Sequence, residues 1–161
     1  MKNIFLLIGM LVTIVTSNAQ RQKKIDIVEL VKITGTGDFS HMKNMVASLG
    51  YLVLDSSKQG DGSQYYISHE MSMDGNMLGC RTDAKLKIKE LTLSIYKKKT
   101  YDELKEQIIK LGFKSKGLHK GTFKEEIESE DFEKGNILIS TGIIDKGGGW
   151  IAHEFTFLRI K

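Results

Sequence analysis

Two histidines, each followed by a glutamate, are the residues in this sequence best suited to acid–base or metal chemistry. His69-Glu70 and His153-Glu154 stand in stretches where apolar residues alternate with polar ones. Because strand side chains alternate between two faces, each histidine is expected on the apolar face and each glutamate on the other. His69 and His153 could share a metal or proton-transfer site only if their strands are neighbours. Neither has a His, Asp or Cys at i+2, which favours hydrogen-bonded core histidines.

Other motifs that carry chemistry fail on spacing. Residues 55–62 have the polar composition of a calcium loop, but the twelfth position from Asp55 is Tyr66 instead of glutamate. The glycines at 147–149 do not link a strand to a helix as a phosphate loop does. No Gly-x-Ser-x-Gly motif is present. We therefore expect no cofactor, and a protein that is not an enzyme.

Charge and cysteine content narrow the possible partners. The formal net charge is +4, and the few arginines are not interleaved with aromatic residues, so no nucleic-acid partner is expected. Cys80 is the single cysteine, which excludes an internal disulfide. It is expected to be a small buried hydrophobe. Pairing with another chain or thiol chemistry is the alternative, but no second cysteine supports it.

The first nineteen residues have the pattern of a secretory signal peptide. Lys2 precedes an apolar run over 4–15, and Ser17 and Ala19 occupy the positions that a signal peptidase accepts. A helix over 4–15 would be roughly 18 Å long, too short for a ~30 Å hydrocarbon core, which disfavours the alternative of an uncleaved anchor. This leader resembles signal peptides of Bacteroidetes, especially flavobacteria. The resemblance implies a periplasmic or secreted protein, and no later segment is apolar enough to span a membrane.

A repeat organises the mature chain, residues 20–161, which has the length of a single domain. Residues 38–51 match 100–113 at an offset of 62, and each match has the apolar spacing of a short helix. The expected helix caps are Asp38 and Thr100, with Glu103 completing a capping box, and the expected left-handed glycines are Gly50 and Gly112. Residues 26–33 suit a helix or a strand, and we favour a helix.

Alternating stretches predict four strands after each repeated helix. The predicted strands lie near 51–56, 64–73, 77–82, 86–97, 113–118, 121–129, 136–145 and 149–160, with turns at 74–75, 134–135 and 147–149. Residues 90–93 resemble 154–157 at an offset of 64, and a change of parity near Lys89-Glu90 predicts a bulge. The prediction is an α+β fold of two tandem units, about 24–98 and 99–161, each a short helix or helix–turn–helix plus an antiparallel sheet of about four strands.

This element order resembles the β-lactamase inhibitory protein fold. The resemblance covers nearly the whole mature chain, but it includes no diagnostic motif, so no functional residues are transferred. It implies a scaffold that binds proteins on an open sheet.

Strand alternation separates a face that meets the helices from a face available for binding. The apolar face is expected to carry Tyr65, Ile67, Met71, Met73, Leu91, Leu93, Ile95, Ile137, Ile139, Ile143, Ile151, Phe155 and Phe157. The opposite face is expected to carry Tyr66, Ser68, Glu70, Thr92, Ser94, Tyr96, Lys124, Glu126, Ser140, Trp150, Glu154 and Thr156.

On that opposite face, a mixture of aromatic and polar groups is typical of protein-binding surfaces. The candidate binding residues are Tyr66, Tyr96, Trp150, Glu70 and Glu154. Trp150 is expected at the lip of the face, and the alternative is that it packs under a loop or a helix.

The predicted function is therefore an exported, non-enzymatic protein-binding module: an inhibitor, an immunity-type antidote or an envelope adaptor. The alternative is a small-ligand or envelope-lipid carrier with an apolar pocket between helices and sheet. An enzyme that uses His69 or His153 is the third hypothesis. The sequence leaves the oligomeric state open.

Overall fold

The computed structural model describes residues 25–58, 60, 63–70, 76–119 and 126–160. At 52–55, 68–70 and 126–127 it describes the backbone alone. The predicted signal peptide, the turn at 74–75, and the predicted face positions of Lys124, Met71 and Met73 lie outside the described residues.

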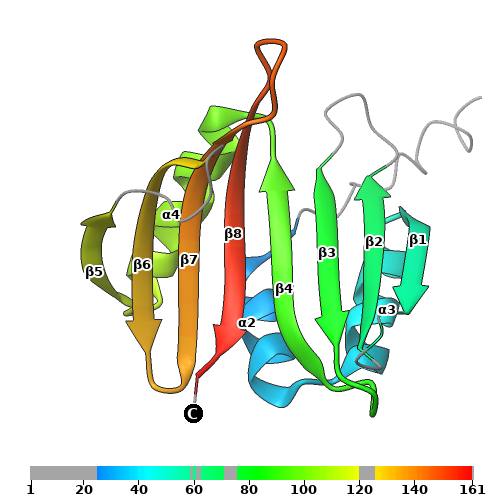
Figure 1. Ribbon diagram of the computed structural model, residues 1–161. Coiled ribbons are helices and arrows are strands. Elements are labelled where there is room, and N and C mark those ends of the chain that lie inside the picture. The colour runs from blue at the N-terminus through cyan, green and yellow to red at the C-terminus, as the bar shows by residue number, and fades with distance from the viewer. Residues whose placement is uncertain (1–24, 59, 61–62, 71–75, 120–125, 161) are drawn as a thin grey trace, which may run out of the picture.

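A single antiparallel sheet of eight strands forms one layer, and three helices of the described chain lie against one of its faces (Figure 1). The strand order is β1-β2-β3-β4-β8-β7-β6-β5. An α+β fold is therefore confirmed. The elements are α2 (Ile27–Thr36), α3 (Phe39–Ser48), β1 (Tyr51–Lys58), β2 (Gln64–Glu70), β3 (Met77–Thr82), β4 (Ile88–Ile95), α4 (Lys98–Lys110), β5 (Lys114–His119), β6 (Glu126–Lys134), β7 (Ile137–Asp145) and β8 (Ile151–Arg159).

The ambiguous segment near residue 30 is a helix, as favoured from the sequence. Asp26 caps α2, because its Oδ1 accepts a hydrogen bond from the Val28 N–H at 2.9 Å. Gly37 ends the helix with a left-handed φ of 69°. Ile27, Leu30 and Ile33 are 0% exposed. Burial of this apolar face outweighs the preference of β-branched residues for strands.

The caps of the repeated helices are only partly as predicted. Asp38 caps α3 by accepting from the His41 N–H at 3.0 Å. The prediction that Thr100 is an N-cap was wrong, because α4 begins at Lys98 and Lys97 occupies the cap position without a side-chain bond. A Lys98–Asp102 ion pair of 2.7 Å supports the additional residues of the first turn. The two expected left-handed glycines are confirmed, Gly50 with a φ of 75° and Gly112 with a φ of 83°.

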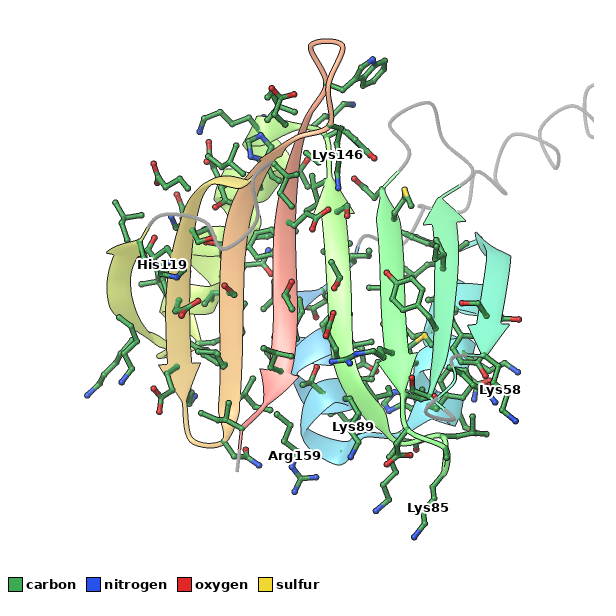
Figure 2. All side chains as sticks on the ribbon, in the orientation of Figure 1. Lys58, Lys85, Lys89, His119, Lys146 and Arg159 are labelled. Atoms are coloured by element: carbon green, nitrogen blue, oxygen red, sulfur yellow. The ribbon has the colours of Figure 1, made fainter. Side chains whose placement is uncertain are left out.

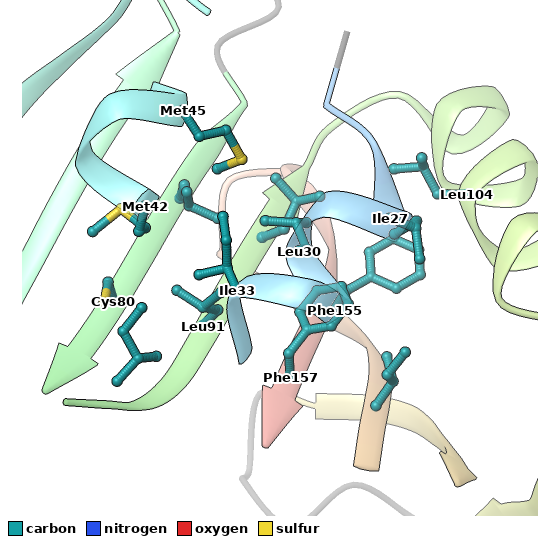
Figure 3. Packing of buried hydrophobic residues seen from close by; sticks show 14 of the residues in the cluster. Ile27, Leu30, Ile33, Met42, Met45, Cys80, Leu91, Leu104, Phe155 and Phe157 are labelled. Carbon is teal, nitrogen blue, oxygen red and sulfur yellow. The ribbon is translucent and has the colours of Figure 1, made fainter. Parts of the chain in front are cut away.

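Helix α2 packs across the centre of the sheet. It contacts β4, β7 and β8, and also α3 and α4. Figure 3 shows its residues Ile27, Leu30 and Ile33 among Leu91 of β4 and the phenylalanines of β8. These side chains fill the space between α2 and the join of β4 with β8. The helix therefore covers the centre of the sheet, where β4 pairs with β8.

Strand parity is confirmed in the centre of the sheet. The predicted apolar positions of β4 are buried, as are Ile137 and Ile139 of β7 and Phe155 and Phe157 of β8. The bulge is confirmed as well. Arg81 pairs with Glu90 while its neighbour Thr82 pairs with Ile88, which leaves one extra residue, Lys89, in β4.

In β2 the predicted parity was wrong. Tyr66 pairs with Cys80, and its ring lies 4.4 Å from the ring of Phe39 in α3, so it faces the helices. Tyr65 instead lies over Gly79 on the opposite side, and Ile67, two residues on, shares that side. Two adjacent tyrosines made either phase compatible with the sequence. Contact with α3 decides in favour of burying Tyr66.

Candidate binding face

The sheet has one face that the described helices leave uncovered, and we call it the open face. Figure 2 views the molecule onto this face, with the helices behind the sheet. A row of residues crosses the middle of this face over six strands, and each residue of the row pairs with the next one on the neighbouring strand. The row consists of Ile67, Gly79, Thr92, Thr156, Ser140 and Asp131. Short side chains therefore form most of the floor of the open face.

Glu154 is held rigidly near the centre of the open face. Its Oε1 accepts a hydrogen bond from Ser94 Oγ at 2.9 Å and one from Lys146 Nζ at 3.0 Å. Its side chain is 17% exposed. The carboxylate is therefore oriented in advance and still reaches solvent, and its predicted place on the open face is confirmed.

A second carboxylate, Glu90, lies on the same face. Arg81 of β3 donates to its Oε2 at 2.9 Å across the strand pair. The side chain of Glu90 is 27% exposed. Each of these two glutamates thus carries one cationic partner, and the centre of the face combines fixed carboxylates with threonine hydroxyls.

Tyr65 is a component of this face that the sequence did not reveal. A methyl group added at Gly79 would stand 2.5 Å from Tyr65 Oη, so the ring lies directly over that glycine. Partial burial raises the pKa of Tyr65, and the nearby charges of Glu90 and Glu154 raise it further. The hydroxyl therefore stays protonated and can donate a hydrogen bond. The sequence would have placed Tyr65 on this face only if the alternation of β2 had been assigned the opposite phase.

Tyr96 and Trp150 form an aromatic corner at the end of the face. Their rings meet edge to face, with centroids 6.4 Å apart. Tyr96 Oη also lies 3.8 Å from Met77 Sδ. Trp150 is 68% exposed, so the alternative that it packs under a loop was wrong. The three glycines before it all have positive φ, which lets the β7–β8 hairpin turn sharply.

The other candidate residues are not part of this group. Tyr66 is on the helix side, so its assignment to the open face is corrected. The side chain of Glu70 is not among those described, and the same holds for Ser68 and Glu126. The proposed face therefore rests on Tyr65, Tyr96, Trp150, Glu90 and Glu154.

A shared site of His69 and His153 is excluded by the strand order. Their strands, β2 and β8, are separated by β3 and β4. Three spacings of about 4.8 Å place the two backbones roughly 14 Å apart. His153 itself is buried, as expected for a core histidine, but the expected hydrogen bonding is incomplete, because its buried Nδ1 has no partner among the described residues. Within the described residues, no group of three or more His, Cys, Asp or Glu could hold a metal ion.

A serine, an aspartate and a histidine do meet near the β5 edge, in an order that does not suit nucleophilic catalysis. Ser140 Oγ donates to Asp131 Oδ1 at 2.6 Å, and His119 Nε2 lies 3.5 Å from Asp131 Oδ2. The aspartate stands between the other two residues. An activated serine needs the imidazole beside its hydroxyl as the general base. This trio therefore provides polar contacts that link β5, β6 and β7.

Cys80 is an inert core residue, as expected. It is 1% exposed, and burial, with a smaller contribution from Glu90, raises the pKa of its thiol to about 12. A thiol in that state supplies almost no thiolate near neutral pH.

A hollow of about 540 Å³ lies between α2 and α3. Its floor includes Met45 and Leu49, and its rim includes Asp26, Glu29 and His41. The ligand-carrier hypothesis placed a pocket between helices and sheet. That space is occupied by the fully buried side chains of α2, β4 and β8. The hollow therefore differs in position from the expected one.

No helix in the described part of the chain combines the length and apolarity needed to cross a bilayer. Comparison of the whole chain with protein-family models, curated proteins and solved structures gives no significant match. The open face is therefore interpreted from its own residues and geometry.

Proposed function

We propose that this chain is an exported, non-enzymatic protein-binding module whose open face contacts another protein. The observation that carries the proposal is the position of the helices. All three described helices lie on one side of the sheet, and the other side carries polar, charged and aromatic side chains that reach solvent. An inhibitor, an immunity-type antidote and an envelope adaptor all use such a surface.

The composition of the open face supports binding of a protein. Interfaces are enriched in Tyr, Trp, Met and Arg, and hot spots cluster where large side chains adjoin fixed polar groups. Here Trp150, Tyr96 and Met77 form one group, and Met77 pairs with Ser94, whose hydroxyl donates to the carboxylate of Glu154. A rigid sheet presents these groups with little loss of conformational entropy on binding.

We also propose that the chain consists of two tandem units forming one domain. Thr92 of β4 pairs directly with Thr156 of β8, which stands 64 residues later. That is the offset at which residues 90–93 match 154–157 in sequence. Equivalent residues meet only at a local two-fold axis, so the axis passes between these threonines. The same symmetry relates Glu90 to Glu154, and this arrangement supports the resemblance to the β-lactamase inhibitory protein fold.

A second candidate function, a small-ligand or lipid carrier, is favoured by the hollow between α2 and α3. Its volume, about 540 Å³, lies within the range of small-molecule sites. Saturable binding of a fluorescent lipid that Met45→Trp abolishes would support this function. Both candidate functions include a periplasmic or secreted location, because we infer that location from the leader sequence.

Capture of partners from a periplasmic extract tests the main proposal. The bait is the wild-type mature chain, compared with a Tyr96→Ala, Trp150→Ala double variant. Ile109→Ala serves as the matched control, because Ile109 is 56% exposed on α4, away from the open face. A specific partner should be lost with the double variant and retained with the control. Equal capture of every partner by all three baits would refute the proposed surface.

A further inference from the structure

His153 is a buried histidine beneath α4. The residue is 6% exposed, and its ring stacks on Tyr101 of α4 with centroids 4.7 Å apart and an interplanar angle of 25°. Tyr101 also contacts Phe155, whose ring centroid is 5.0 Å away. The imidazole therefore forms part of the surface on which α4 rests.

One polar ring atom of His153 is left without a hydrogen bond in the described part of the chain. Its Nδ1 is buried and has no hydrogen-bond partner among the described residues. A neutral imidazole tolerates this position, because the unprotonated nitrogen carries no charge. A protonated imidazole would place an extra N–H and a positive charge in the same apolar contact, which is far less favourable.

The charged groups facing the imidazole do not offset this effect. They come from α4, where the positive charge of Lys98 opposes protonation and the negative charge of Asp102 favours it. Asp102 is already bonded to Lys98, with distances of 2.9 Å and 2.7 Å to its two oxygens. On the neighbouring strands, Ile95 of β4 and Ile143 of β7 pair with His153. Neither residue supplies a negative charge.

We infer that His153 acts as an acid-sensitive latch for α4: its neutral ring holds the helix on the sheet, and protonation in mild acid releases the helix. Burial, followed by the charge of Lys98, lowers the pKa of His153. The docked helix is therefore fully stable above pH 6.5, the ordinary histidine value, and becomes less stable as the pH falls below it. This inference is independent of partner binding on the open face.

A second contact between α4 and the sheet does not titrate in the same range. Lys105 Nζ lies 2.6 Å from Glu130 Oε2 of β6. Burial alone would raise the pKa of Glu130, but hydrogen bonds from Lys105 and Ser115 lower it overall. Glu130 therefore remains ionised at pH 5. Any loosening of α4 between pH 7.5 and pH 5 is expected to come from His153.

Proton NMR of the mature chain tests the titration directly. The chain has four histidines, and the variants His41→Asn, His69→Asn, His119→Asn and His153→Phe assign their ring signals. The His153 signal should titrate below the ordinary value of about 6.5. A His153 signal that titrates at or above that value would overturn the inference, and the three variants other than His153→Phe assign this signal by elimination if His153→Phe does not fold.

Hydrogen exchange tests the release of the helix. After correction for the intrinsic rate, the amides of residues 101–110 should open about tenfold more often for each pH unit below 6.5, until the folded pKa is reached. His153→Phe preserves ring stacking on Tyr101 and should abolish this dependence. His119→Asn, an exposed surface change, should leave it unaltered. Equal pH dependence in wild type and His153→Phe would also overturn the latch.

Discussion

Two neighbouring residues of β4 provide a test of which sheet face is open, and the test needs no partner protein. Leu93 is 0% exposed on the helix side, whereas Thr92 is partly exposed on the open face. Leu93→Ala should lower the free energy of unfolding by about 3 kcal/mol, within the 2–5 kcal/mol typical of buried leucines. A typical domain is stable by roughly 5–15 kcal/mol. The variant should therefore lose a large share of its stability.

The companion substitution, Thr92→Lys, places a longer charged side chain on the open face. It removes only a weak contact from Thr92 Oγ1 to Glu90, at 3.5 Å, and the added amine reaches solvent. We expect a loss of less than about 1 kcal/mol, within the span of strand propensities. Urea unfolding followed by circular dichroism measures both changes, and the slope of the transition should stay constant. Losses of similar size for Thr92→Lys and Leu93→Ala would refute the assignment of faces.

Three further predictions concern single contacts. Gly79→Ala should push the Tyr65 hydroxyl off the glycine, since the new Cβ would stand 2.5 Å from it. Ultraviolet titration should then show the raised pKa of Tyr65 moving down toward its ordinary value. Glu130→Gln should lower the free energy of unfolding by about 1–2 kcal/mol at pH 7, between the values for exposed and buried ion pairs. Because the folded pKa of Glu130 is lowered, this stabilisation is present above about pH 4.5 and disappears as the pH falls through the folded value. Urea unfolding should therefore show a smaller difference between wild type and variant at pH 3 than at pH 7. Cys80 should react with iodoacetamide in urea but not in the folded chain at pH 8, given a thiol pKa of about 12; rapid labelling without urea, measured by mass spectrometry, would contradict its burial.

Local patterns predicted the helices and most strands of the described chain, because these depend on neighbours in sequence. Asp38 caps the helix that its position indicates, and Gly50 and Gly112 follow the ends of theirs. The bulge at Lys89 followed from a parity change visible in the sequence. Such features require only alternation, capping and glycine geometry.

Features that depend on distant contacts could not be predicted in the same way. The phase of β2 is decided by contact of Tyr66 with Phe39, which the alternating pattern of 64–70 does not contain. The pairing of β4 with β8 separates β2 from β8, and that separation removes the shared histidine site. The first turn of α4 starts before Thr100 although Thr100 and Glu103 match a capping box. Contacts distant in sequence decide the first two cases, whereas at α4 the local Lys98–Asp102 ion pair supports a helix that starts before the capping box.

Site-specific photocrosslinking in the native host tests the central claim most directly. A benzophenone amino acid replaces Thr156, at the centre of the open face, and in a matched variant it replaces Ile109 on α4. We expect a discrete protein adduct from position 156 that is absent from position 109 and weakened by Trp150→Ala. An adduct that forms only from position 109, or none from position 156 in folded protein, would contradict it.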